Sequence, residues 1–164
     1  MKSQLSIILN RDFDAFACLL GQYVLLRGKP LAMDRFVLML EEDRDDRYLT
    51  DQILSELQID VPIKFLANSN QFFDFLSTSA RPVLILIDYN SVPNNGIEVL
   101  KKLKSHSSYS DIPVVILSDS DHPGYKQACY EYGASSFIKK PDTIAATRNK
   151  IAAFFNYWFR VVEV

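Results

Sequence analysis

Five polar residues stand within two positions of the ends of apolar runs in this sequence. They are Glu41, Glu42, Asp88, Ser118 and Lys140. Carboxylates are ligands for Mg²⁺ and can also act as nucleophiles, while a lysine amine can neutralise an anion. If the fold gathers these side chains, they form an acidic pocket that contains one positive charge.

The apolar runs in front of these residues have the length and composition of buried strands. Continuous apolar segments of roughly four to eight residues are typical of parallel strands that are covered on both faces. We expect five strands, at Phe36–Leu40, Ile63–Ala67, Val83–Ile87, Val114–Leu117 and Ser135–Ile138.

Helical patterns separate the predicted strands. Leu49, Ile53 and Leu57 recur at helical spacing, and Asp45 or Asp46 is expected to cap that helix. Further helices are predicted at Asn68–Ser79, around Ile97–Leu103, at Pro123–Tyr132 and at Thr143–Phe159.

Five consecutive strand–helix units predict an α/β fold, a doubly wound five-stranded parallel sheet between two helical layers. Ligands of such sheets bind beyond the carboxyl ends of the strands. The five polar residues should therefore converge on one edge of the sheet. We expect residues 34–164 to form this domain and residues 1–33 to be an N-terminal extension of uncertain structure.

Composition excludes several function classes. The 164 residues suit one domain, and a net charge of −2 provides no basic surface for nucleic acid. The apolar run Ala15–Leu26 is shorter than the roughly 20 residues of a membrane span. Cys18 and Cys129 are far apart and the two histidines are isolated, which disfavours a zinc site. We expect a cytoplasmic protein with free thiols.

In this order and spacing, the polar residues resemble the receiver domain of two-component response regulators. That family places an acidic pair after the first strand, a phosphoacceptor aspartate after the third, Ser or Thr after the fourth and Lys-Pro after the fifth. The matching residues here are Glu41-Glu42, Asp88, Ser118 and Lys140-Pro141, with spacings of 46, 30 and 22 residues from Glu42 onward. The resemblance covers residues 34–159 and implies the flavodoxin-like, three-layer receiver fold.

The resemblance also implies a role for each residue. Asp88 would accept a phosphoryl group, and Ser118 and Lys140 would bind its oxygens. Phe137 stands where the family has a switching aromatic side chain. The implied Mg²⁺ ligands are Glu41, Glu42, Asp88 and the backbone carbonyl of Asn90.

The implied partner is a sensor histidine kinase or a histidine phosphotransfer protein. Because the sequence stops where the last receiver helix stops, we expect a stand-alone, single-domain response regulator rather than an enzyme. Output is expected through the face made by the last two helices, where aromatic residues suggest a homodimer contact. These aromatic residues are Tyr125, Tyr132, Phe155 and Phe159.

Two departures from the family pattern leave an alternative open. Glu42 stands where the family usually has Asp, and Asp119 stands where it usually has a small residue. Both favour a pseudo-receiver that binds partners without phosphorylation. An enzyme that works through an aspartyl phosphate is disfavoured, because Asp88-Tyr89-Asn90 lacks the second carboxylate of a DxD motif.

Overall fold

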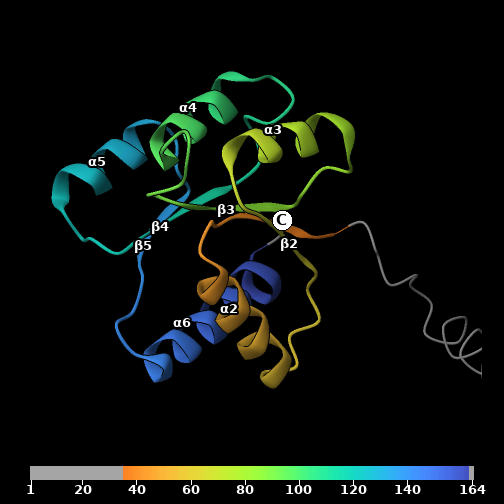
Figure 1. The fold of residues 1–164 in the computed structure, drawn as a ribbon, viewed down its shortest axis with the longest axis vertical. Helices are drawn as coiled ribbons and strands as arrows, with labels where there is room; N and C mark the ends of the chain where they lie inside the picture. The colour runs from red at the N-terminus through yellow and green to blue at the C-terminus, as the bar shows by residue number, and fades with distance from the viewer. Residues whose placement is uncertain (1–34, 163–164) are drawn as a thin grey trace, which may run out of the picture. The chain divides into compact units, whose positions relative to one another are not determined.

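The computed structural model describes residues 35–162, and the predicted extension 1–33 lies outside them. Strands and helices alternate along the described chain (Figure 1). They are β1 (Val37–Leu40), α2 (Arg44–Glu56), β2 (Ile63–Leu66), α3 (Ser69–Thr78), β3 (Leu84–Asp88), α4 (Gly96–Ser105), β4 (Val114–Ser118), α5 (Pro123–Glu131), β5 (Ser136–Lys139) and α6 (Ile144–Asn156). A π-helical turn, Tyr157–Val161, continues α6.

The strands form one parallel sheet in the order β2-β1-β3-β4-β5. The predicted doubly wound α/β sheet is therefore confirmed. Since all strands run the same way, their carboxyl ends share one edge. In register, Leu40 lies beside Ile87, and Asp88 lies beside Leu117. This register aligns the polar residues at the strand ends.

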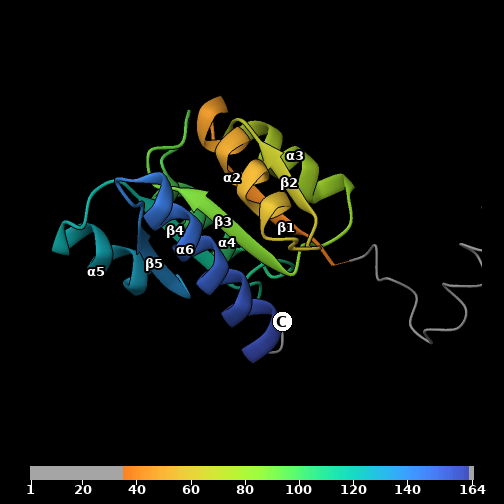
Figure 2. The ribbon, with the colours of Figure 1, turned by 90° about the horizontal axis from the view of Figure 1, so that it is seen from below.

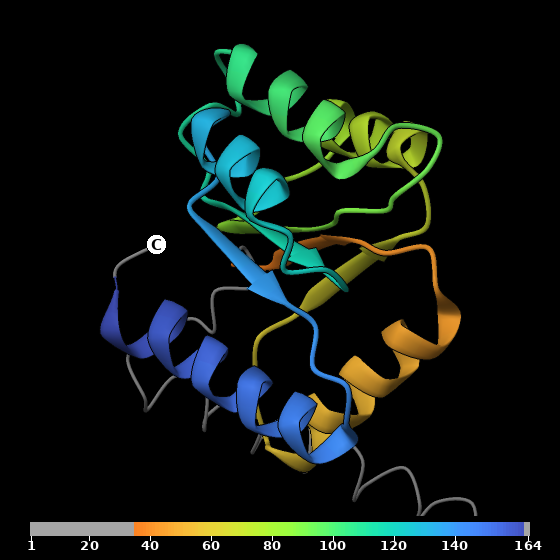
Figure 3. The same cartoon turned by 90° about the vertical axis from the view of Figure 1, so that its left-hand side faces the viewer.

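Two helical layers cover the sheet. Helices α2 and α6 lie on one face, and α3, α4 and α5 lie on the other (Figures 1 and 3). Side chains alternate between the faces along each central strand. Leu38, Ile85 and Ile116 pack in the core under α3, α4 and α5, whereas Met39 and Leu86 pack in the core under α2 and α6.

Helices α2 and α6 also contact each other (Figure 2). Arg148 of α6 forms an ion pair with Glu56 of α2. Among residues 35–162, no helix is both long and apolar enough to cross a bilayer.

The start of α2 differs from the prediction. Asp43 is the N-cap, and its side chain accepts a hydrogen bond from the backbone N–H of Asp45 at 2.7 Å. The expectation that Asp45 or Asp46 caps the helix was wrong, because α2 begins at Arg44 and both residues fall in its first turn. This earlier start leaves the Asp46 side chain free for another contact.

Candidate functional site

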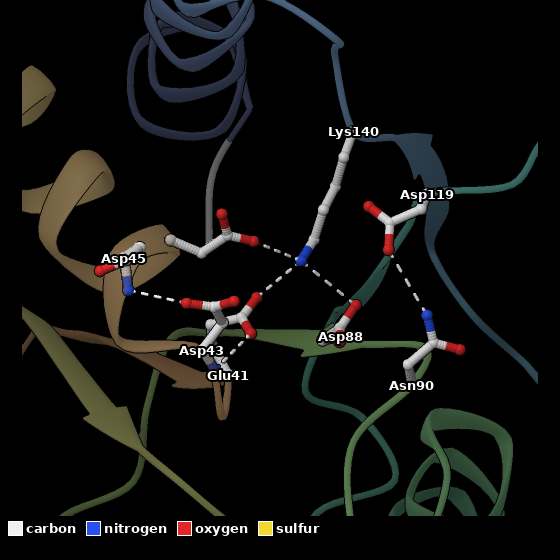
Figure 4. Close-up of polar contacts among 8 residues, drawn as sticks. Glu41, Asp43, Asp45, Asp88, Asn90, Asp119 and Lys140 are labelled. Carbon is white, nitrogen blue, oxygen red and sulfur yellow. Dashed lines mark hydrogen bonds and ion pairs between the residues drawn. The ribbon is translucent and has the colours of Figure 1, made fainter.

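Glu41 and Asp88 lie next to each other at the carboxyl edge of the sheet (Figure 4). Asp88 is the last residue of β3, and Glu41 directly follows β1. The pairing of Leu40 with Ile87 brings the two acidic residues into line. Their side chains are only 1% and 6% exposed for Glu41 and Asp88. Two carboxylates are thus buried where neighbouring strands end.

Lys140 reaches this acidic pair from the far side of β4. Its backbone N–H donates to the carbonyl oxygen of Ser118 at 2.7 Å, which fixes the chain just after β5. Its amine nitrogen Nζ lies 2.8 Å from Glu41 Oε2 and 2.8 Å from Asp46 Oδ2, both hydrogen bonds. The same nitrogen lies 3.4 Å from Asp88 Oδ1, an ion pair (Figure 4). One cation is therefore shared by three carboxylates.

Burial and mutual charge shift the pKa values of these groups. Burial raises the pKa of Glu41 and of Asp88, and contacts with Lys140 oppose that rise only in part. Burial by itself lowers the pKa of Lys140, but its hydrogen bonds with Asp46 and Glu41 and the charges of Glu41 and Asp88 raise it above the ordinary lysine value. Lys140 therefore carries its charge at neutral pH, whereas burial disfavours the charged forms of Glu41 and Asp88.

The loop after Asp88 is held close to the sheet. The backbone N–H of Tyr89 donates to Leu117 at 2.7 Å, and that of Gly96 donates to the Tyr89 carbonyl at 2.9 Å. A Cβ atom at Gly96 would lie 2.9 Å from both the Asp88 carbonyl oxygen and Tyr89 Cα. A side chain there would force the loop away, so glycine allows α4 to begin against the site.

Ser118 and Asp119 stand at the end of β4. Ser118 is buried, and its hydroxyl accepts a hydrogen bond from the backbone N–H of Ser120 at 3.2 Å. Asp119 is exposed and accepts a hydrogen bond from the side-chain amide of Asn90 at 3.5 Å (Figure 4). In addition to burial, the charge of Asp119 raises the pKa of Asp88. Asp119 and Asn90 therefore join two loops beside Asp88.

The structure gathers Glu41, Asp88 and Lys140 but not Glu42. Glu42 is exposed and makes no hydrogen bond or ion pair with the described residues. Asp46 stands in the cluster instead, although the sequence pattern suggested only a helix-capping role for it. A signal was present, since Asp46 precedes Leu49 by three residues and Ile53 by seven on the sheet-facing stripe of α2.

Phe137 lies on β5 and is half buried against the core under α3, α4 and α5. Its backbone N–H donates to the hydroxyl of Tyr130 at 3.3 Å. Tyr130 itself is 45% exposed on α5. A ring at this position is close to the surface and also touches the core, which is what a switching side chain requires.

The donor set at the edge suits Mg²⁺. Within residues 35–162, no group of three or more His, Cys, Asp or Glu side chains is arranged so that it could hold a metal ion by itself. Mg²⁺ needs few carboxylates because it keeps several waters. Asp88 Oδ1 is buried, accepts no hydrogen bond from the described residues and lies 3.4 Å from the Lys140 amine, so its lone pairs can still bind a cation. Oxygen donors with a free lone pair fit the ion better than they fit zinc.

The predicted aromatic face is only partly present. Tyr125 on α5 and Tyr132 at its C-cap are 41% and 42% exposed. Phe155 is buried, and Phe159 packs against the core under α2 and α6. The prediction that both phenylalanines supply surface was wrong for Phe155, which α6 turns toward the sheet, whereas Phe159, in the π-helical turn, is only partly buried.

Comparisons with known proteins agree with this geometry. The family profile described as the response regulator receiver domain matches residues 37–152. Response regulator Rcp1 of Synechocystis sp. is 26% identical over 136 residues, which cover 79% of this chain and 92% of that protein. Two-component response regulator ARR17 of Arabidopsis thaliana is 32% identical over 114 residues, which cover 64% of this chain and 74% of that protein.

Solved structures give the same result. The crystal structure of the Mn²⁺-bound form of Rcp1 has a TM-score of 0.73 at 26% identity, covering 79% of this chain and 97% of that one. A response regulator from Hahella chejuensis has a TM-score of 0.70 at 27% identity, covering 79% and 98%. The receiver fold is therefore confirmed, and receivers act as phosphoryl-accepting signalling modules. From its sequence profile, its relatives and its parallel sheet, this chain belongs to the response regulator receiver domain family.

Proposed function

We propose that this protein accepts a phosphoryl group on Asp88 from a phosphohistidine, in a reaction that depends on Mg²⁺. The observation that carries the proposal is the Asp88 carboxylate itself. It is buried at the end of β3, its Oδ1 has no hydrogen-bond donor among the described residues, and the Lys140 amine stands 3.4 Å away. A nucleophile with a free oxygen beside a fixed cation suits phosphoryl transfer.

In this reaction a carboxylate oxygen of Asp88 attacks phosphorus and forms an O–P bond. The N–P bond of the donor breaks, and the imidazole leaves with the electron pair of that bond. Lys140 neutralises one oxygen of the transferred group, and the Ser118 hydroxyl donates to another. The Ser118 hydroxyl now accepts from Ser120, so its hydrogen remains available for donation.

Mg²⁺ supplies neutralisation of the phosphoryl oxygens when it is bound. Asp88 and the backbone carbonyl of Asn90 are the proposed direct ligands. The Glu41 carboxylate, next to Asp88, is proposed to help hold the ion. Glu42, exposed on the same loop, is proposed to act through water. The Mn²⁺-bound form of Rcp1 supports a divalent cation in this family.

Phosphorylation is proposed to be read out by movement of Ser118 and Phe137. A shift of Ser118 toward the phosphoryl group opens space into which the half-buried Phe137 ring turns. The partner we propose is a sensor histidine kinase or a histidine phosphotransfer protein in the cytoplasm. Association through α5 and its C-cap, where Tyr125 and Tyr132 are exposed, is the proposed route to a homodimer.

A second candidate is a pseudo-receiver that binds partners without phosphorylation. The contact between Asp119 and Asn90 favours it, because it places an extra carboxylate beside Asp88. That charge repels an incoming phosphoryl group. The pseudo-receiver predicts partner binding that is unchanged by Asp88→Asn, whereas the phosphorylated receiver predicts binding that depends on Asp88.

Beryllofluoride, a mimic of the phosphoryl group, separates the two candidates. Amide spectra of the wild-type protein are recorded with Mg²⁺, before and after beryllofluoride is added. We expect shifts at Ser118, Phe137 and Lys140, and none in Asp88→Asn. Asp74→Asn, which removes an exposed carboxylate on α3, is the matched control and should respond as wild type. A wild-type spectrum that does not change contradicts phosphoryl acceptance.

A further inference from the structure

Lys140 makes its shortest side-chain contacts with residues other than Asp88. Its amine lies 2.8 Å from both Glu41 and Asp46, but 3.4 Å from Asp88. The Asp88 contact has no hydrogen-bond geometry, since Asp88 Oδ1 has no donor among the described residues. The resting amine is therefore held toward β1 and α2, and away from the residue that the proposed reaction uses.

Asp46 differs from the other two carboxylates in position and exposure. Glu41 and Asp88 are buried at the sheet edge, whereas the Asp46 side chain is 43% exposed in the first turn of α2. Its hydrogen bond to Lys140 joins the end of β5 to α2, two segments 94 residues apart. Exposed ion pairs are weak, so this contact is the one that breaks most readily.

We propose that Asp46 is a positioning residue that holds Lys140 before phosphorylation and competes with the phosphoryl group for it. The inference rests on the proposed function of Asp88. A phosphoryl group on Asp88 carries about two negative charges and draws the amine more strongly than one carboxylate does. Lys140 then leaves Asp46, and the link between β5 and α2 opens. Phosphorylation thereby releases α2 as well as rearranging Ser118 and Phe137.

The chain provides a matched control in the adjacent residue. Asp45 and Asp46 both lie in the first turn of α2, where a negative charge favours the helix dipole. Asp45 is exposed, and no contact joins its side chain to Lys140. Asp45→Asn and Asp46→Asn therefore remove the same charge from the same helix turn, and only the second removes the Lys140 contact.

The test measures beryllofluoride affinity at saturating Mg²⁺ for wild type and both variants. We expect Asp46→Asn to bind beryllofluoride about threefold more tightly than Asp45→Asn, as expected for loss of one partly exposed competing pair. Without beryllofluoride, the side-chain NMR resonance of Lys140 should move in Asp46→Asn and stay in place in Asp45→Asn. If Asp46 had a purely structural role, neither the beryllofluoride affinity nor the Lys140 resonance of Asp46→Asn would differ from that of Asp45→Asn.

The outcomes separate this inference from the proposed function. If wild type binds beryllofluoride and the two variants have equal affinities, competition by Asp46 is wrong while phosphoryl acceptance stands. An unchanged Lys140 resonance in Asp46→Asn contradicts the resting contact itself. If wild type does not bind beryllofluoride at all, the proposed function and the competition both fail.

Discussion

Along β3, the four residues Leu84 to Ile87 are apolar and at most 5% exposed, whereas the next residue, Asp88, is just as buried and carries a carboxylate. The same change occurs where β1 passes from Leu40 to Glu41. The strand interiors gain free energy by burying apolar surface. Their ends lose free energy by taking charge out of water.

The residues that stabilise the fold and the residues that can take part in chemistry therefore lie only a few positions apart in the same strand. The raised pKa values of Glu41 and Asp88 record the cost of burying charge at the edge. The positive charge of Lys140 offsets part of the cost of burying these carboxylates. Binding of a cation, or transfer of a phosphoryl group, would change the part that remains. Substitutions inside the sheet should therefore lower stability without changing the site. Substitutions at the edge should change the site, and their effect on stability should be smaller and of opposite sign.

The largest stability effect is expected from the sheet interior. Ile85→Ala removes a fully buried side chain from the middle of β3 and leaves a cavity. We expect a loss of about 3 kcal/mol in the free energy of unfolding, measured with urea. The protein that remains folded should bind beryllofluoride with wild-type affinity.

Ile144→Ala is the matched control, because Ile144 is 68% exposed at the start of α6. Its effect on stability should stay below about 0.5 kcal/mol. If Ile85→Ala weakened beryllofluoride binding in proportion to its loss of stability, the strand interior would also determine binding at the edge, which contradicts the proposed division.

A smaller effect of opposite sign is expected at the edge. Burial raises the pKa of Asp88, so the folded state binds this proton more tightly than the unfolded state does. Stability from this group is present at acid pH and is lost as pH rises through the folded pKa. Asp88→Asn has no carboxyl group to ionise at this position and therefore avoids the loss of stability. At pH 7 without Mg²⁺, its thermal midpoint should exceed that of wild type by about 2–4 °C.

The advantage of Asp88→Asn should shrink as pH falls toward the range in which Asp88 of wild type is protonated. Mg²⁺ should raise the midpoint of wild type and leave that of Asp88→Asn unchanged. Differential scanning calorimetry from pH 4 to pH 8 measures both trends. A midpoint of Asp88→Asn below that of wild type at every pH would show that Asp88 stabilises the fold.

The interior was more predictable than the edge. Apolar runs located all five strands of the sheet to within about one residue, because each run is short, apolar and bounded by polar residues or turns. The predicted strand at Val83–Ile87 shifts by one, so that Asp88 ends β3 rather than following it. Such differences do not change which residues reach the edge.

At the edge, the positions of the residues at strand ends predicted that Glu41, Glu42, Asp88, Ser118 and Lys140 converge, and Glu42 is the member that stays outside the cluster. Asp46 was missed because its contact depends on how α2 packs against the sheet. That packing cannot be recognised in the stretch 41–46, where five of the six residues are acidic. Phe155 was misplaced for a related reason, since aromatic composition does not say which side of α6 faces the sheet. Both errors concern side chains on helices, whose direction is set by tertiary packing.

The mass of the intact protein after incubation with acetyl phosphate and Mg²⁺ tests the central claim most directly. The account predicts that wild type gains the mass of one phosphoryl group, that the gain is lost with chelator, and that Asp88→Asn gains none. Wild type that gains no mass under conditions in which another receiver is phosphorylated would contradict it, as would an equal gain in Asp88→Asn.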